Sequence, residues 1–535
     1  MKQWLAPVHL ALTLVIIVWN VVLAGRIAQL RQATRPFAAI TGLAALLILP
    51  AFIVAMATTT VITGRAISAI DWLWPTIVLL FAVQSVYAVS RRLVNPLWGY
   101  PIAFFNVMLA IAGIARFVSA HGVDLPRPLL VLMAAQVDAL ALVTTDAAIT
   151  SPFFLHVPLI APAFPALTRF TAGLRLFMSI IAVSWFAVII AEIPRADVAL
   201  ASYDSHADDL LHERPNGFFL GLKLLPDVQG TPSAASVSTD VETARFAGVN
   251  AVNVVFAPGA TVVAVDSVAH VLDQMQRDSL IVIATIGYHG KLLPELKRGQ
   301  LEMESRLTTI RRVLTRLRPD VLVPAQDPYG VGARILGRLS PREWQDYHTR
   351  VAAIVKEVRP RTRVAFAAAA FDTRDSVLYA WAAATGSPID IVGFSFYPSR
   401  LGARSMDAAF RAADRWMRAL PPRKPHWVWG AGGYPLAHGE RSQDRAIWAA
   451  LSWATAHGGI QGLVVTEASD YGQALGVRAP NGRYRRAAVD VQKAVKALKE
   501  SVAPEGSQPT QPASGNAPAQ TPGSKAPQAT KTKRP

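Results

Sequence analysis

Carboxylate side chains stand at the ends of two apolar runs in the second half of this 535-residue chain. Asp327 follows the run at 320–325, and Glu467 ends the run at 460–467. A pair of carboxyl groups can bind sugar hydroxyls, or act as general acid and base on either side of a glycosidic bond. Both carboxylates are therefore candidates for binding sugar hydroxyls or transferring protons.

Aromatic and hydrogen-bonding side chains occur at the ends of the same and neighbouring runs. Aromatic faces stack on sugar rings, while amide and imidazole groups bond to sugar hydroxyls. His289 is expected to line a cleft rather than bind a metal, because no second histidine or carboxylate stands at ligand spacing. We expect no metal and no cofactor. The candidate substrate-binding residues are Tyr288, His289, Gln326, Tyr329, Tyr397, Trp427, Trp429 and Tyr434.

The elements that would position these residues alternate along the chain from residue 216. Short β-branched runs are separated by longer amphipathic stretches, which is typical of a parallel sheet with crossover helices. Eight such runs over 216–500 predict a (β/α)8 TIM barrel, in which reactive groups gather at the carboxyl ends of the strands. A doubly wound open sheet is the alternative. The eight runs are 217–225, 249–256, 280–287, 320–325, 363–371, 389–398, 426–430 and 460–467.

Four phrases of this half resemble a known family. They are RFAGVNAVNVVF, PAQDPYG, IDIVGFSFYPS, and GGYP followed by ERSQDRAIWAALSWA. In order and spacing they are similar to the (β/α)8 glycoside hydrolases, over roughly 216–490. Members of that superfamily carry an acid/base carboxylate after strand four and a nucleophile after strand seven.

The resemblance implies roles for individual residues. Where the family shows Asn-Glu-Pro after strand four, this chain has Gln326, Asp327 and Pro328. Asp327 would be the acid/base, with its carboxyl retracted by about 1.5 Å relative to a glutamate, and a displacement of about 1 Å can cost a hundredfold in rate. Where the family shows Glu-x-Gly-Trp/Tyr-Pro after strand seven, this chain has AGGYP at 431–435. Ala431 stands in the nucleophile's place, so the standard retaining route is closed.

Each candidate also has a structural interpretation. Asp327 begins an Asp-Pro pair that favours a turn, and this interpretation is as good as the catalytic one. Glu467 could be an inverting base. The preferred interpretation is that Glu467 lies at the rim of the barrel and pairs with a nearby arginine. Asp372 and Asp375 are expected to cap the helix that follows them.

The first 195 residues form a different kind of domain. Six long runs with few charged residues are each close to the length needed to cross a bilayer, so we expect an all-α, multi-pass membrane domain over 1–195. Residues 196–215 are expected to be a linker, and 501–535, rich in Pro, Gln, Ala, Ser and Thr, a disordered tail. The six spans are roughly 4–25, 38–62, 72–90, 98–119, 128–149 and 173–193.

Arginines in the loops predict the orientation, because Lys and Arg resist translocation. The loops after spans one and three and before span six are the basic ones. If these are cytoplasmic, the N-terminus and the barrel are extracytoplasmic. Residues 151–167 are apolar but contain four prolines, which favours a re-entrant or interfacial segment over a seventh span.

Span five contains Asp138 and Asp146. Ionisable groups at membrane depth are functional candidates, for example in an ion path or at a polar head group. The preferred interpretation places Asp146 near the interface and gives Asp138 a hydrogen bond to a neighbouring helix.

The net positive charge of the chain does not by itself indicate a nucleic-acid partner. The net charge of +17 is spread over membrane-flanking loops and helix faces, so no nucleic acid is expected, and the absence of cysteine excludes thiolate chemistry. The expected partners are a polysaccharide or oligosaccharide and the lipid bilayer. Other envelope polysaccharide proteins are further candidate partners. A membrane-anchored glycosidase, a non-catalytic glycan-binding barrel, and a transporter or assembly component that uses Asp138 all remain as functions.

Overall fold

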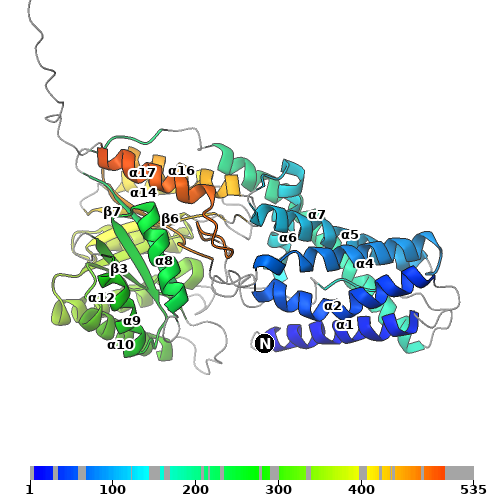
Figure 1. Cartoon of the computed structure of the whole chain (residues 1–535). Helices are drawn as coiled ribbons and strands as arrows, with labels where there is room; N and C mark the ends of the chain where they lie inside the picture. The colour runs from blue at the N-terminus through cyan, green and yellow to red at the C-terminus, as the bar shows by residue number, and fades with distance from the viewer. Residues whose placement is uncertain are drawn as a thin grey trace, which may run out of the picture.

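The computed structural model places a helix bundle beside a closed barrel (Figure 1). The bundle comes from the first 205 residues, and the barrel comes from the rest. The residues that the structure describes are 5–27, 34–57, 68–94, 96–121, 123–143, 157–161, 169–205, 210–214, 217–228, 234–275, 280–288, 300–332, 339–396, 406–420, 424–433, 435, 440–470 and 475–500.

Helices occur at all six places where spans are expected. Among the described residues, three stretches are long and apolar enough to cross a membrane: Arg35–Val54, Leu73–Ser90 and Gly99–Val118. Ala11–Ile27 is a shorter apolar stretch. The helices are α1 (Leu5–Ile27), α2 (Arg35–Ala57), α4 (Leu73–Ser90), α5 (Pro96–Ala120), α6 (Arg127–Val143) and α7 (Arg169–Ser205), with a short 3-10 turn, η2 (Ser68–Ile70), before α4.

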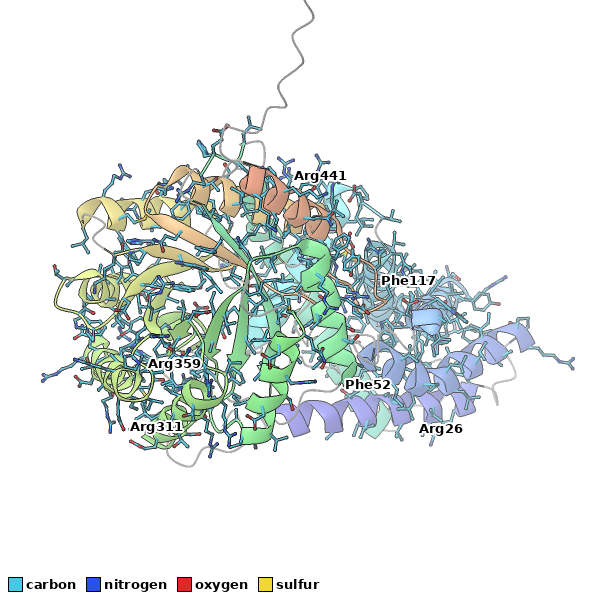
Figure 2. The ribbon with its side chains drawn as sticks, turned by 60° about the vertical axis from the view of Figure 1, so that its left-hand side comes forward. Arg26, Phe52, Phe117, Arg311, Arg359 and Arg441 are labelled. Atoms are coloured by element: carbon cyan, nitrogen blue, oxygen red, sulfur yellow. The ribbon has the colours of Figure 1, made fainter. Side chains whose placement is uncertain are left out.

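The bundle begins and ends on the same side. The start of α1 lies at the end of the bundle nearest the barrel, and Arg26 near its end lies at the opposite end (Figures 1 and 2). The last of the described bundle helices, α7, ends beside the barrel, so the chain enters and leaves the bundle on the same side. Which side of a membrane this is stays a prediction from the arginines.

An extended segment, residues 157–161, is buried among the bundle helices. Side-chain amides of Asn20, Gln84 and Asn106, on α1, α4 and α5, each donate to one of its carbonyls and accept one of its N–H groups. For Asn106 and Leu159 the two distances are 2.6 and 2.9 Å. Non-helical backbone is tolerated at membrane depth only when protein groups satisfy it. The segment therefore agrees with the expected packing of 151–167 on the bundle, though the rest of that range lies outside the described residues.

The eight strands form a closed parallel barrel in the order of the sequence. The (β/α)8 prediction is confirmed, and the doubly wound sheet is excluded because β1 pairs with β8. The strands are β1 (Phe219–Val228), β2 (Ala251–Phe256), β3 (Ile281–Ile286), β4 (Val321–Val323), β5 (Arg363–Ala368), β6 (Ile391–Phe396), β7 (His426–Ala431) and β8 (Ile460–Val465).

Amphipathic helices surround the barrel. They begin with local caps where the sequence offers them: Ser340 and Glu343 form a capping box before the longest of them. The helical elements are α8 (Ala234–Ala247), α9 (Val262–Asp273), α10 (Gln300–Arg316), η5 (Pro328–Gly332), α12 (Pro341–Val358), α13 (Thr373–Ala383), α14 (Met406–Ala419), α16 (Glu440–Ala456) and α17 (Arg486–Glu500).

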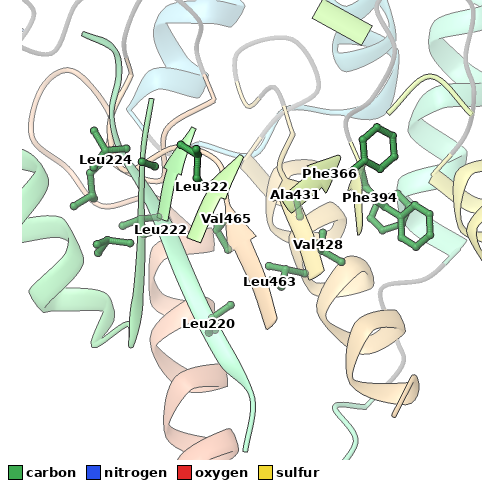
Figure 3. Packing of buried hydrophobic residues seen from close by; sticks show 14 of the residues in the cluster. Leu220, Leu222, Leu224, Leu322, Phe366, Phe394, Val428, Ala431, Leu463 and Val465 are labelled. Carbon is green, nitrogen blue, oxygen red and sulfur yellow. The ribbon is translucent and has the colours of Figure 1, made fainter. Parts of the chain in front are cut away.

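Side-chain alternation on the strands separates two cores. One face packs against the helices and includes Leu222, Val428 and Val465 (Figure 3). The other fills the barrel interior and includes Ile283 and Val464. Because successive strand residues point to opposite faces, each residue's place in this alternation decides whether it can reach the barrel interior.

A polar residue precedes each of three even-numbered strands and bonds to the strand before it. Asn250 accepts the N–H of Leu220 at 2.7 Å, and Asp320 accepts that of Val282 at 2.9 Å. Asp390 accepts the N–H of Val364 at 2.7 Å. These bonds join neighbouring strands at the amino-terminal end of the barrel. In TIM barrels this end contributes to stability, whereas catalytic residues lie at the carboxyl end.

The connection between the halves is ordered where it is described. Residues 196–205, expected to belong to a linker, are the last part of α7. Beyond them, Arg214 donates to the carbonyls of His457 at 2.8 Å and Ile460 at 2.6 Å. The chain is thus bonded to the start of β8 before it enters β1.

Candidate functional site

Asp327 lies just after β4, at the carboxyl end of the barrel. Its residue is only 2% exposed, and its φ of +45° lies in the left-handed region that non-glycine residues seldom adopt. The Asp327 carbonyl accepts the N–H of Gly330 at 2.9 Å and of Gly332 at 3.1 Å, which closes η5 as a single π-helical turn. The expected turn is therefore real, and backbone outliers of this kind cluster at functional sites.

Tyr288, after β3, lies against this turn. A methyl group added at Gly332 would come within 2.3 Å of the Tyr288 Oη. The guanidinium carbon of Arg306 lies 4.2 Å from the centre of the Tyr288 ring, within cation–π range. Arg306 is fully buried and donates to the carbonyls of Gly287 and Pro324, at the ends of β3 and β4. Tyr288 and Asp327 thus belong to one packed unit.

Gln326 and Tyr329 flank Asp327. The Gln326 N–H donates to the Ile286 carbonyl at 3.0 Å, which extends the pairing of β3 and β4 to the turn. Tyr329 is 8% exposed, and burial raises the pKa of its hydroxyl. A buried neutral phenol can serve as a hydrogen-bond donor but not as a base.

Asp372 and Asp375 differ in role. Asp372 caps α13 as expected, accepting the Asp375 N–H at 2.9 Å. One carboxylate oxygen of Asp375 instead accepts three consecutive N–H groups, from residues 369–371, at 2.8 to 3.0 Å. Burial raises the pKa of Asp375 to about 7. This carboxyl organises the loop after β5, whose Ala369 packs beside Gly330 in the Asp327 turn.

Glu467 follows β8 and is 7% exposed. Its N–H donates to the Leu475 carbonyl at 3.1 Å, and its own carbonyl accepts the Val477 N–H at 2.8 Å. The peptide bond between Thr466 and Glu467 is cis. A carboxylate–arginine pair does occur after β8, between Asp470 and the buried Arg485 at 2.6 Å.

The two candidate carboxylates come from opposite strands. In the closed order β1 to β8, β4 and β8 are four strands apart in either direction. Asp327 and Glu467 both follow the carboxyl ends of their strands, so both lie at the carboxyl end of the barrel. This differs from the pairing after strands four and seven that the family resemblance implies.

The end of β7 has a packing role. Ala431 is fully buried in the helix-facing core with Val428 and Val465 (Figure 3). At Gly432, an added methyl group would lie 2.7 Å from the Thr466 carbonyl. Within 426–433 there is no carboxylate, and at Gly432 the Thr466 carbonyl leaves no room for one.

Trp427 and Trp429 fill the barrel interior. Trp427 is fully buried and stacks on Phe219 with ring centres 5.8 Å apart, and on Trp429 at 5.4 Å. The indole N–H of Trp429 donates to the Phe366 carbonyl at 2.9 Å. With Trp427 fully buried, these contacts assign both rings to packing rather than to sugar stacking.

Three buried polar residues of the interior were not among the sequence candidates. Lys223 on β1, 3% exposed, alternates with helix-facing leucines and pairs in register with Asn253 on β2. Thr285 on β3 donates to the Asn253 side chain at 2.9 Å. Lysine is rarely buried unless it is paired or functional. The single charged residue in the apolar run GFFLGLKLL is therefore the sequence feature that could have identified Lys223 as a candidate.

The remaining candidates cannot be placed. His289, Tyr397, Tyr434 and Asp146 lie outside the described residues, and of Asp138 only its position in α6 is described. No group of three or more His, Asp or Glu side chains suited to a metal occurs in the part of the chain that is described.

Solved structures with related barrels include three sugar-acting enzymes. A GH113 β-1,4-mannanase matches 52% of this chain and 99% of its own, with 11% identity and a TM-score of 0.39. A family 1 β-glucosidase from Thermotoga maritima matches 54% of this chain and 99% of its own, with 11% identity and a TM-score of 0.43. A β-glucuronidase from Ruminococcus gnavus matches 54% of this chain, which spans about half (52%) of that enzyme, with 13% identity and a TM-score of 0.39. No family model and no curated protein matches this chain.

Proposed function

We propose that this protein is a membrane-anchored, glycoside-hydrolase-like barrel that acts on a cell-envelope or exported polysaccharide. The observation that carries the proposal is Asp327, a buried carboxylate held in a left-handed turn at the carboxyl end of β4. Its position matches that of the acid/base in the family that the sequence resembles. The apolar helices would keep the barrel at the membrane surface, facing the extracytoplasmic side.

The chemistry that suits this arrangement is inversion. Retaining hydrolysis needs a second carboxyl at about 5 to 5.5 Å, whereas inversion needs about 6.5 to 9.5 Å with a water between. Asp327 would protonate the leaving oxygen, and Glu467, from the opposite strand, would activate the water. Lys223 and Asn253, in the interior between them along the ring, would orient sugar hydroxyls.

A non-catalytic glycan-binding barrel is the second candidate. It is favoured by the end of β7, where Ala431 is packed in the core and Gly432 is closed off by a backbone carbonyl. Such a barrel would hold a glycan for a membrane polysaccharide assembly or transport component.

The test uses full-length protein in detergent with a panel of envelope polysaccharides. Asp327→Asn is the informative variant, because asparagine tolerates the left-handed conformation and so keeps the turn. Catalysis predicts release of reducing ends with inverted anomeric configuration, a loss of rate of at least about a hundredfold in Asp327→Asn, and retained binding. Binding without cleavage by the parent protein supports the second candidate, and neither binding nor cleavage contradicts both.

A further inference from the structure

A cavity of about 350 Å³ lies between the helix bundle and the barrel. On the bundle side the lining combines the apolar Val123, Leu125, Leu130 and Leu200 with Asp124 and Arg127. The other side is cationic and polar, made by Arg441, Ser442 and Arg445 of α16. Figure 2 shows Arg441 where the barrel meets the bundle. The cavity therefore offers an apolar and a cationic surface to the same ligand.

The acidic residues in its lining are paired with other arginines. Glu440 contacts Arg483 and, at 3.8 Å, Arg485. Asp124 lies 3.9 Å from Arg486. For Arg441, which is exposed, no ion pair is formed with any residue of the described ranges. Because Glu440 is paired with Arg483 and Asp124 lies beside Arg486, the arginines in the lining favour an anion.

The first turn of α16 adds to this preference. Glu440, Arg441 and Ser442 are its first three residues, and N–H groups in a first turn have no partner inside the helix. The partial positive charge at a helix start stabilises phosphate and similar anions. The arginine side chains and the helix start thus act on the same cavity.

The cavity also lies close to the end of a candidate membrane span. The apolar stretch Gly99–Val118 ends five residues before Val123. Placed across a bilayer, a stretch of that length would fill the hydrocarbon core and bring residues 123–130 to the depth of lipid head groups. A ligand with an apolar chain could enter from the bilayer.

We propose that this cavity binds a phosphate ester carried on an apolar chain. The phosphate would lie against Arg441, Arg445 and the start of α16, and the chain against Val123, Leu130 and Leu200. Such a site would bring a membrane-held phosphate ester next to the barrel. A phospholipid and a lipid-linked substrate share this chemistry.

The experiment measures ligand binding to purified full-length protein in neutral detergent by native mass spectrometry and by thermal shift. The probes are phosphatidylglycerol, zwitterionic phosphatidylcholine and inorganic phosphate. We expect phosphatidylglycerol to bind in preference to phosphatidylcholine, and Arg441→Glu to weaken it by about tenfold or more, as expected for loss of a charge-assisted bond and introduction of repulsion. Arg311→Gln, on the barrel surface away from the bundle (Figure 2), is the matched control and should bind as the parent does.

The probes separate the sources of the phosphate. One outcome is that inorganic phosphate binds, that Arg441→Glu abolishes this binding, and that neither lipid is preferred. The phosphate site would then stand, but its ligand would be soluble and the proposed apolar chain would be wrong. The proposal is overturned if the two lipids bind equally and Arg441→Glu changes neither. It is also overturned if no probe binds to a parent protein whose melting transition shows that it is folded.

Discussion

The guanidinium of Arg306 lies over the ring of Tyr288, 4.2 Å from its centre, while it donates to carbonyls at the ends of both β3 and β4. One buried side chain from α10 thereby fixes the two strand ends that flank the candidate acid. The Tyr288 hydroxyl in turn lies over Gly332, the last residue of the Asp327 turn. The position of Asp327 therefore depends on the packing of Arg306, Tyr288 and Gly332.

A methyl group at position 332 tests this dependence. Gly332→Ala places a Cβ 2.3 Å from the Tyr288 hydroxyl, which Arg306 prevents from moving freely. We expect a loss of about 1 to 3 kcal/mol in unfolding free energy, the usual range for overpacking, and a loss of any Asp327-dependent activity. Gly386→Ala is the control, because nothing lies within 4 Å of the added methyl group. Its unfolding free energy should stay within about 0.5 kcal/mol of that of the parent. Equal melting and equal activity of the two variants would show that the turn is not constrained by Tyr288.

The fold could be predicted because its signals are local. Each β-branched run and each apolar helix is visible within about 10 to 25 residues, and the alternation of the two types indicates parallel strands. Even the turn at Asp327 follows from Asp-Pro and two nearby glycines. Strand ends were less exact: the run at 389–398 contains β6 as Ile391–Phe396.

The candidate site was harder because side-chain direction depends on pairing. Trp427 and Trp429 both point inward, as alternation requires, but the register with β6 shifts between Phe394 and Ser395, so Ala431 packs against the helices instead of facing inward as well. Nothing in WVWGAGGYP reveals that shift. Likewise, the bonds from Asn20 to residues 158 and 160 join parts of the chain about 140 residues apart, which no local pattern predicts.

A carboxylate cannot simply be restored after β7. In Ala431→Glu the new side chain would be directed into the apolar layer around Val428 and Val465. We expect a loss of about 3 kcal/mol or more in unfolding free energy, or failure to accumulate, because the charge would be buried without a partner. Ala384→Glu, at an exposed position after α13, should be nearly neutral by thermal melting. A stable Ala431→Glu protein with new hydrolytic activity would show that position 431 opens to the barrel mouth.

The Asp375 carboxyl should make stability depend on pH. Burial raises its pKa from 3.8 to about 7, so between these values the folded protein holds a proton that the unfolded chain releases. The contribution of Asp375 to stability therefore falls as pH rises through this window. Asp375→Asn keeps an oxygen for the three N–H groups but cannot ionise.

Melting temperatures of the parent and of Asp375→Asn, measured from about pH 5 to about pH 8, check this linkage. The parent should lose stability relative to the variant as pH rises. Asp346→Asn, which changes an exposed carboxyl on α12, should follow the parent across the range. Parallel curves for the parent and Asp375→Asn would mean that the carboxyl ionises normally.

The side of the membrane on which the barrel lies can be read by cysteine labelling. The chain has no cysteine, so each introduced thiol is the sole target for a membrane-impermeant maleimide. Ser90→Cys marks the end of α4 next to Arg91 and Arg92, and Gly386→Cys marks an open position on the barrel. Because arginine-rich loops stay in the cytoplasm, we expect intact spheroplasts to label at position 386 but not at 90, and both to label after lysis. Labelling of 90 alone in intact spheroplasts would place the barrel in the cytoplasm and remove exported polysaccharide as its substrate.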